Sequence, residues 1–317
     1  MGDFRSDSKD VGVVRVRVGI PQGLLHFQYG AVMERFLAEL GAEVVLSGET
    51  SRHTLDCGSV LDEVCLPAKV FFGHACHLRN QVDYLFLPRV VSIRPGQYTC
   101  PKIIGMPDLL RNNVGNLPAI IDINIDMRQK SRQIYQAVIA VGRFFGRGVA
   151  ASLYAWFKAW QYRAQVRRGP LAWAYDGRPQ LALIGHPYIV YDRQISFDTL
   201  GKLNKLGMQV ITPEMVDAGE INRAAARLEK QLYWSNSHTI AGAAMALMTG
   251  DRPLSGIIFM TCFACGPDAL VGELIKQQAG KRNIPCMQLS LDEHTAEAGL
   301  VTRLEAFADM LKRRQAL

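Results

Sequence analysis

The sequence lacks the features that would place it in a membrane or outside the cell. None of the apolar runs in its 317 residues reaches the roughly 18 residues of a membrane-spanning helix. The first stretch, MGDFRSDSKD, is polar and carries charges of both signs, which is not the pattern of a secretory signal. We therefore expect a cytoplasmic protein with no membrane span.

Acidic residues are fewer than basic ones: 29 Asp and Glu stand against 36 Lys and Arg, a formal net charge of +7. Such an excess points to an anionic partner only where it is clustered. The cluster is the segment 143–173, whose basic and aromatic residues include Arg143, Arg147, Lys158, Arg163, Arg167, Arg168, Trp156, Trp160 and Trp173. One reading is a docking surface, and the other is a helical connection packed across two domains with its arginines facing water. Because no RNA- or DNA-binding motif accompanies the charge, we expect no nucleic-acid partner.

The first half of the sequence alternates strand and helix patterns. RVRVGI predicts a strand, GAVMERFLAEL has apolar residues at helical spacing and ends at Gly41, and AEVVLS predicts a second strand. VDYLFLPRVVS predicts a third strand, and it is nearly all apolar, as expected for a strand covered on both faces. This β-α-β order predicts a parallel sheet with crossover helices.

The pattern restarts near residue 180, with strands predicted in QLALIGHPY, LGMQVITP, LSGIIFMTCF and IPCMQLSLDEH. The stretch AEAGLVTRLEAFADMLKRR predicts a closing amphipathic helix. We predict an α/β protein of two Rossmann-like, doubly wound parallel-sheet domains joined by a long helical segment. The predicted divisions are a disordered tail, 1–15, an amino-terminal domain, 16–125, a helical connection, 126–178, and a carboxy-terminal domain, 179–317.

Seven cysteines without an export signal indicate a reducing compartment, so disulfides are not expected. Three of these cysteines share a local pattern: Cys65 in DEVCLPAKVFFGH, Cys100 in YTCPKIIGMPDLLRN and Cys265 in FACGPDALVGELI. Each has a proline one or two positions later and then a helical pattern. Because proline suits the first turn of a helix, each cysteine is predicted at or just before a helix N-terminus.

A helix N-terminus favours the thiolate over the thiol, because it presents unpaired N–H groups and a partial positive charge. We therefore expect a lowered pKa at these three cysteines. Ligands of open α/β sheets collect at the carboxyl ends of the strands, so the thiols could converge in a cleft between the domains. Three dispersed soft ligands suit an iron–sulfur cluster better than a structural zinc site, which usually takes four ligands. Three unrelated structural cysteines are the alternative reading.

The other cysteines carry weaker signals. Cys262 and Cys265 form a C-x-x-C pair, which is the spacing of a redox dithiol, but Cys262 falls near the end of a strand where burial is expected. Cys57, Cys76 and Cys286 are interpreted as core or surface filler.

Seven short motifs follow one another in the order of a known protein family: GIPQGLL, DEVCLPAKVFFGH, DYLFLPRVVS, CPKIIGMPDLLR, IGHPYIVYD, FACGPDALVGELI and LDEHTAEAGLVTRLEAF. The chain resembles the activase-associated domain of unknown function found with 2-hydroxyacyl-CoA dehydratase activators, from about residue 16 to 312. That domain is itself similar to the cysteine-bearing dehydratase subunits and to double-cubane cluster proteins. Ala264, Ala269 and Ala296 depart from the family pattern, at no proposed ligand.

The resemblance implies that Cys65, Cys100 and Cys265 hold an oxygen-sensitive iron–sulfur cluster. Three cysteines fit one [4Fe–4S] cluster with an open iron, or half of a bridged double-cubane cluster across a dimer. The electron would come from an ATP-hydrolysing activase of the actin-like fold. This chain contains no G-x-x-x-x-G-K-[ST] loop and no actin-like phosphate-binding pattern, so we expect it to bind no nucleotide itself. A homodimer is expected by analogy alone.

Five further residues are candidates for the site. Lys69 and Lys102 follow two of the cysteines and would offset the negative charge of an iron–thiolate cluster. Arg89 ends an apolar strand, and it faces either the cleft or a nearby acid. His186 in GHPY and His294 in DEHT follow strands, where they are either proton donors, hydrogen-bond donors to the cluster or structural histidines. Asp268 and Glu297 fall early in helices, where carboxylates stabilise the first turn, and are not interpreted as catalytic.

Three functions remain open on the sequence. The first is an iron–sulfur protein that receives a low-potential electron from an ATP-dependent activase and uses it reductively on a small molecule. The second is a 2-hydroxyacyl-CoA dehydratase subunit, a lyase, for which no CoA phosphate pocket is recognisable. The third is a non-catalytic zinc-binding or docking module.

Overall fold

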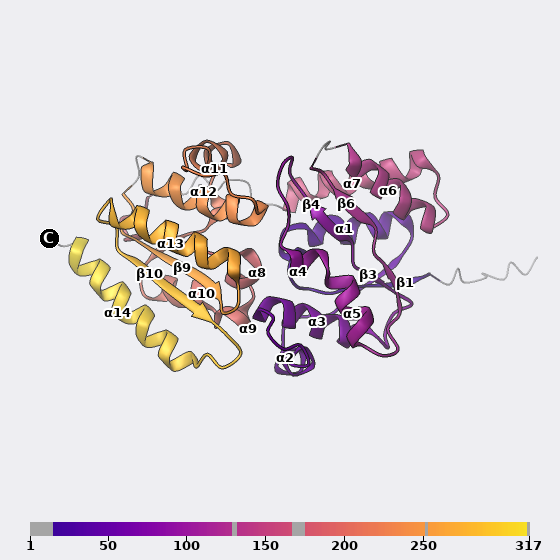
Figure 1. Cartoon of the computed structure of the whole chain (residues 1–317), viewed down its shortest axis with the longest axis horizontal. Helices are drawn as coiled ribbons and strands as arrows, with labels where there is room; N and C mark the ends of the chain where they lie inside the picture. The colour runs from indigo at the N-terminus through magenta and orange to yellow at the C-terminus, as the bar shows by residue number, and fades with distance from the viewer. Residues whose placement is uncertain (1–14, 129–131, 167–174, 251–252, 316–317) are drawn as a thin grey trace, which may run out of the picture.

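The computed structural model describes residues 15–128, 132–166, 175–250 and 253–315. It contains two four-stranded parallel sheets, each with helices on both faces, which lie beside one another (Figure 1). The α/β class and the two doubly wound parallel sheets predicted from the sequence are confirmed. Most of the predicted tail, and Arg167, Arg168 and Trp173 of the basic segment, lie outside the described residues.

The first sheet has the strand order β2-β1-β3-β5. Its strands are β1 Arg17–Ile20, β2 Glu43–Leu46, β3 Tyr84–Phe86 and β5 Ala119–Ile121. The helix after β1 ends as predicted, because Gly41 takes the left-handed conformation with φ 98° and its N–H bonds back to the last turn.

The second sheet repeats this topology with the order β10-β9-β7-β8. Its strands are β7 Gln180–Ile184, β8 Gln209–Ile211, β9 Gly256–Cys262 and β10 Cys286–Leu291. All four correspond to predicted strands. Every residue of β7 and β9 is buried, which agrees with their largely apolar sequences.

The predicted third strand of the first half is wrong in one respect, because VDYLFLPRVVS forms two strands in different sheets. β3 ends at Phe86, and after Pro88 the chain forms β4 Arg89–Ser92, which pairs in parallel with β6 Asn124–Asp126. Proline cannot donate a ladder hydrogen bond, so it marks the break between the two strands. β5 and β6 were not predicted, since each has three residues and no clear period.

The first half carries the helices α1 to α7, with these bounds: α1 His26–Leu40, α2 Arg52–Gly58, α3 Leu66–Leu78, α4 Pro101–Ile104, α5 Met106–Asn113, α6 Gln133–Phe144 and α7 Val149–Val166. The second half carries α8 Pro187–Val190, α9 Arg193–Ser196, α10 Thr199–Lys205, the 3-10 helix η1 Pro213–Met215, α11 Ala218–Ala225, α12 Ser235–Thr249, α13 Gly266–Gly280 and α14 Glu297–Gln315.

The basic segment packs on the first half, against α1. The ring of Trp156 meets that of Phe36 edge-on at 5.6 Å, and Lys158 pairs with Glu39. The guanidinium of Arg163 lies 5.1 Å from the ring centre of Tyr29. One expectation from the sequence is a helical connection whose arginines face water. These contacts correct that expectation, because cationic groups of this segment hold α7 to α1.

One apolar core runs through both halves. It joins the α3 and α5 side of the first sheet, with Phe72 and Leu110, to the α10 and α14 side of the second, with Leu203 and Leu304. Separate clusters lie under α1, α6 and α7 and under α11, α12 and α13. The shared core brings the loops at the inner ends of the two sheets together. None of the helices in the described part of the chain has the length and apolar character of a membrane-spanning helix.

Candidate functional site

Each of the three predicted cysteines is the N-cap residue of a helix. Cys65 begins α3, Cys100 begins α4 and Cys265 begins α13, and proline occupies the first or second position of all three helices. The prediction from the cysteine and proline spacing is therefore confirmed. His186 occupies the same place at the start of α8, before Pro187, so the same local device occurs four times.

The four helix starts meet around Tyr188, which is buried with 8% of its surface exposed. Burial raises the pKa of this tyrosine well above its usual value, and negative charge on Asp268, Cys265, Cys65 and Cys100 raises it further. A charge acts on a phenol in this way only from close by. The charges of the three thiols thus act on one side chain, although Cys65 and Cys265 are 200 positions apart in the sequence.

Cys65 and Cys265 are not acidified, which corrects the expectation of a lowered pKa at these two thiols. Burial raises the pKa of Cys65, and the charges of Cys100 and Asp268 add to the rise, against lowering by Lys102 and the Ala68 N–H. Burial likewise raises the pKa of Cys265, and so does the carboxylate of Asp268. Loss of hydration therefore outweighs the helix N-terminus at both residues. A metal that binds these thiols has to displace their protons.

A buried polar network lies beside Cys265. The carboxylate of Asp268, fully buried in the first turn of α13, contacts His186 Nε2 at 2.8 Å and accepts a hydrogen bond from Thr261 at 3.1 Å. One ligand atom from each of His186, Cys265 and Asp268 lies within 4.8 Å of the others. Burial acts to raise the pKa of Asp268, but the charge of His186 and the hydrogen bonds of His186, Cys265 and Thr261 lower it.

His186 has a second, unused polar atom. Its ring stacks on that of Tyr188 with centroids 4.7 Å apart, and only 4% of its surface is exposed. Nδ1 is buried without a hydrogen-bond partner in the described part of the chain. Such an atom is costly unless a ligand or a water satisfies it.

The strand order explains why these residues meet. His186 follows β7 and Cys265 follows β9, which are neighbours in the second sheet. The chain leaves β7 toward β8 on one side and reaches β9 on the other, so this is the point where the strand order reverses. Ligands of open parallel sheets bind outside the carboxyl ends of the strands at such a point. Ala264, at φ 64°, turns the chain there in a conformation that favours glycine.

The two candidate lysines differ in position. Lys102 lies at the site: its charge lowers the pKa of Cys65, and its Nζ donates to the Ala264 carbonyl at 3.4 Å. Lys69 is mostly buried and pairs with Glu293 at 2.8 Å, so its charge is already balanced by a carboxylate of the second half. Of the two, Lys102 is the one whose charge reaches a thiol.

Arg89 and His294 do not join the four helix starts. Arg89 binds both oxygens of Asp108, at 2.6 and 2.8 Å, which is the ion pair with a nearby acid considered as the alternative. It also donates to the Ile104 carbonyl. The His294 side chain is 86% exposed and lies 3.8 Å from Glu293. Glu297 pairs with Lys202 at the surface.

Of the remaining cysteines, Cys262 is buried at the end of β9. Burial raises its pKa well above the usual value, and the charge of Cys65 adds to the rise. A redox dithiol needs an accessible thiolate, so these surroundings do not favour that chemistry for the C-x-x-C pair. Cys57 and Cys76 lie on α2 and α3, and Cys286 begins β10.

Sequence reasoning missed Asp268 and Tyr188 as members of the site. A carboxylate in the first turn of a helix is usually a surface feature, and the tyrosine of GHPY had no assigned role. The signal that could have found both is their position, three residues after Cys265 and two after His186, in the first turns of helices that begin at the site.

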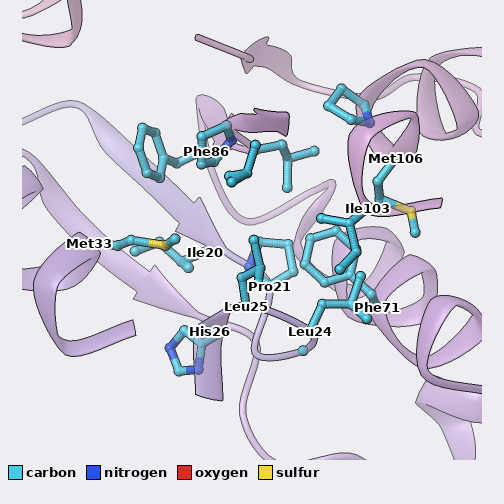
Figure 2. A pocket seen from close by; sticks show the side chains of 15 residues that line it. Ile20, Pro21, Leu24, Leu25, His26, Met33, Phe71, Phe86, Ile103 and Met106 are labelled. Atoms are coloured by element: carbon cyan, nitrogen blue, oxygen red, sulfur yellow. The ribbon is translucent and has the colours of Figure 1, made fainter. Parts of the chain in front are cut away.

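An apolar pocket of about 40 Å³ lies at the corresponding place of the first sheet, where its strand order reverses between β1 and β3. Figure 2 shows Ile20 and Phe86 from the ends of these strands facing Ile103 and Met106. Ile103 belongs to α4, the helix that begins at Cys100. His26 is the ionisable group in the lining, and its Nε2 contacts Glu34 at 2.9 Å.

Comparison with known proteins gives one family. The model of the family described as the CoA enzyme activase uncharacterised domain matches residues 17–216. An uncharacterized protein of Methanocaldococcus jannaschii is 31% identical over 114 residues, which are 36% of this chain and 27% of that protein. The match thus spans about a quarter of the length of that relative.

Among solved structures, the SBP FpvC in complex with a Ni²⁺ ion, from P. aeruginosa, shares 13% identity with this chain. The alignment covers 95% of this chain and 98% of that chain, with a TM-score of 0.29.

Proposed function

The chain belongs to the family of the CoA enzyme activase uncharacterised domain, and we propose that it is an iron–sulfur protein that receives a low-potential electron from an ATP-hydrolysing activase. Cys65, Cys100 and Cys265 would hold a [4Fe–4S] cluster. The observation that carries this proposal is that all three thiols stand at the N-cap of a helix with proline in its first turn, and the charges of all three act on the buried ring of Tyr188. Thiolates are the protein ligands of such clusters.

The surroundings of the thiols fit an anionic iron–thiolate group. Lys102 supplies positive charge near Cys65, and the first N–H groups of α3, α4 and α13 begin directly after the ligands. Nδ1 of His186, also at this site, is buried without a hydrogen-bond partner in the described part of the chain and could hydrogen-bond to a bound group. Once bound, the cluster would supply one-electron transfer at a potential that these hydrogen bonds and charges tune.

The chain's own residues have separate tasks in this proposal. Asp268 holds the imidazole of His186 and contacts the Cys265 thiol, so it fixes two of the four helix starts relative to one another. Tyr188 and Cys262 exclude water from the inner side of the site, since both are buried. A strongly reducing electron has to be driven uphill, which is the physical reason for an ATP-hydrolysing partner.

The apolar pocket favours a second candidate, in which the chain acts on a small molecule as the dehydratase-like lyases do. Its wall includes Ile103, one turn after Cys100, so a short aliphatic group bound there would lie next to a cluster ligand. The cavity of about 40 Å³ would accept a few carbon atoms. A substrate of this kind would shift the spectrum of the loaded protein, and Ile103→Trp would abolish that shift.

The deciding experiment measures iron, acid-labile sulfide and absorption on protein purified without oxygen. Wild-type protein should contain about four irons per chain, as one [4Fe–4S] cluster requires. Cys65→Ser, Cys100→Ser and Cys265→Ser should each lose most of this iron, while Cys286→Ser, a half-buried thiol elsewhere in the second half, should keep it.

No iron in the anaerobic wild type, or unchanged iron in all three variants, would contradict the proposal. Colourless protein with one zinc that depends on Cys265 would instead favour a zinc-binding module at His186, Cys265 and Asp268.

A further inference from the structure

A second group of metal-ligating side chains lies on α2 and α3, away from the four helix starts. Cys57 and His53 are one turn apart on α2, and His77 is in the last turn of α3. His53 and His77 are exposed and Cys57 is half-buried, so a metal ion from solution can reach all three.

The two helices approach each other closely at this place. A Cβ added to Gly73 would lie 1.9 Å from the Thr54 carbonyl oxygen, and one added to Gly58 would lie 2.1 Å from that of Lys69. Two glycines thus let the backbones of α2 and α3 touch. This contact brings His77 of one helix beside His53 of the other.

The arrangement of Cys57 and His53 resembles part of a tetrahedral site. Cys57 Sγ lies 3.6 Å from His53 Nε2. Zinc bound by sulfur at about 2.3 Å and by nitrogen at about 2.0–2.1 Å separates two tetrahedral ligands by about 3.6 Å. The rings of His53 and His77 stand at 77° with centroids 6.3 Å apart. A shared ion requires the exposed His77 side chain to rotate toward Cys57.

We propose that His53, Cys57 and His77 form a Zn²⁺ site that ties α2 to α3, with a fourth position open to water. Imidazole nitrogen and thiolate sulfur are the usual protein ligands of Zn²⁺, whereas Mg²⁺ and Ca²⁺ prefer oxygen. The site is separate from the cluster proposed above and does not rest on it.

The neighbouring Cys76 is not a member of this set. Burial raises its pKa to about 11, and the charge of Cys57 adds to the rise. Cys76 packs instead against the apolar core and serves as the matched control for loss of a nearby sulfur. A bound ion would restrain α3, and Cys65 is the N-cap residue of that helix.

The test is a titration of chelator-treated full-length protein with Co²⁺, followed by displacement with Zn²⁺. Wild-type protein should bind one Co²⁺ with tetrahedral visible bands and a thiolate charge-transfer band. Cys57→Ser should lose the charge-transfer band and weaken Zn²⁺ binding by more than about 100-fold, beyond the effect typical of an outer-shell partner. Cys76→Ser should keep both.

Two further variants separate this site from other causes. His77→Gln, at an exposed position that folding does not require, should weaken Zn²⁺ binding by more than about tenfold. Cys265→Ser should keep the cobalt bands that Cys57→Ser loses, because Cys265 belongs to the separate group with His186 and Asp268 and to the proposed cluster ligands. The proposal is overturned by a wild type without the cobalt bands, by bands that persist in Cys57→Ser, or by bands that disappear in Cys265→Ser or Cys76→Ser.

Discussion

Burial sets the protonation of single residues near the junction of the two halves. His74 is fully buried in α3, and its Nε2 lies 2.9 Å from the hydroxyl of Thr50. That hydroxyl donates to Asp192 at 2.6 Å, so it accepts from the imidazole N–H and joins α3 to the second half. Burial lowers the pKa of His74 to about 4, and the charges of His26 and His77 lower it further.

This histidine predicts a pH dependence of stability. Because its pKa in the folded state is below its ordinary value of 6.5, the unfolded chain binds the proton more tightly. The stabilisation is complete above about pH 6.5 and is lost as the pH falls toward 4, by at most about 3 kcal/mol at about 1.4 kcal/mol per pKa unit. Urea denaturation between pH 4.5 and 8 should show this loss of stability. Burial raises the pKa of Asp192, so protonation of that carboxyl would stabilise the folded state at low pH and oppose the effect of His74.

His294→Gln is the control, because that side chain is 86% exposed. It should preserve the slope of stability against pH, whereas His74→Gln should flatten it. An equal slope in wild type and His74→Gln would show that another group is responsible.

At the scale of elements, helix starts and helix contacts organise the molecule. Four helices begin at a Cys or His followed closely by proline, which is a local feature that the sequence pattern predicts. The contact between α2 and α3 depends instead on two glycines whose missing side chains matter only once the helices meet.

Gly73→Ala should therefore destabilise the protein although alanine favours a helix. Its Cβ would overlap the Thr54 carbonyl oxygen at 1.9 Å, so α2 must move. We expect a net loss of about 1–3 kcal/mol, typical of overpacking, in a urea titration followed by circular dichroism.

Gly299→Ala is the matched control, since that helical glycine of α14 has nothing within 4 Å of an added Cβ. It should gain up to about 1 kcal/mol from helix propensity. A gain of similar size in Gly73→Ala would mean that α2 and α3 are not in contact as described.

At the scale of the whole molecule, the two halves share one apolar core. That core includes the buried side chains of Phe72 and Leu110 from the first half and of Leu203 and Leu304 from the second. The ion pair of Lys69 with Glu293 and the Thr50 to Asp192 hydrogen bond cross the same junction.

Because neither half can unfold without exposing this core, we expect one cooperative transition in urea. Far-ultraviolet circular dichroism and tryptophan fluorescence should give the same midpoint, since Trp156 lies in the first half and Trp234 in the second. Two separated transitions, or midpoints that differ between the probes, would indicate halves that are stable independently.

Much of the fold was predictable because it depends on neighbours in the chain. Gly41 ends its helix, and the largely apolar runs of β7 and β9 are buried strands, as their patterns indicate. Prediction failed where the local signal was short or ambiguous. Pro88 divides one apolar run between two sheets, and β5 and β6 have three residues each.

The candidate site divides in the same way. The spacing of cysteine and proline predicts three N-cap thiols, and the structure has them at those residues. The raised pKa of Cys65 and Cys265 and the buried Asp268 were not predictable, because each depends on side chains from other elements that remove water. Local charge effects on a thiol are outweighed once the thiol is buried.

The sequence by itself determined the alternation of strands and helices, the family and the residues at which the helices begin. These properties follow from side-chain period and backbone sterics, which act over a few neighbouring positions. Only the tertiary structure decided that the charges of Cys65, Cys100 and Cys265 act on the buried Tyr188, and that His53 lies beside Cys57 and His77. Convergence and loss of hydration depend on how sheets and helices pack, and residues distant in the sequence set both.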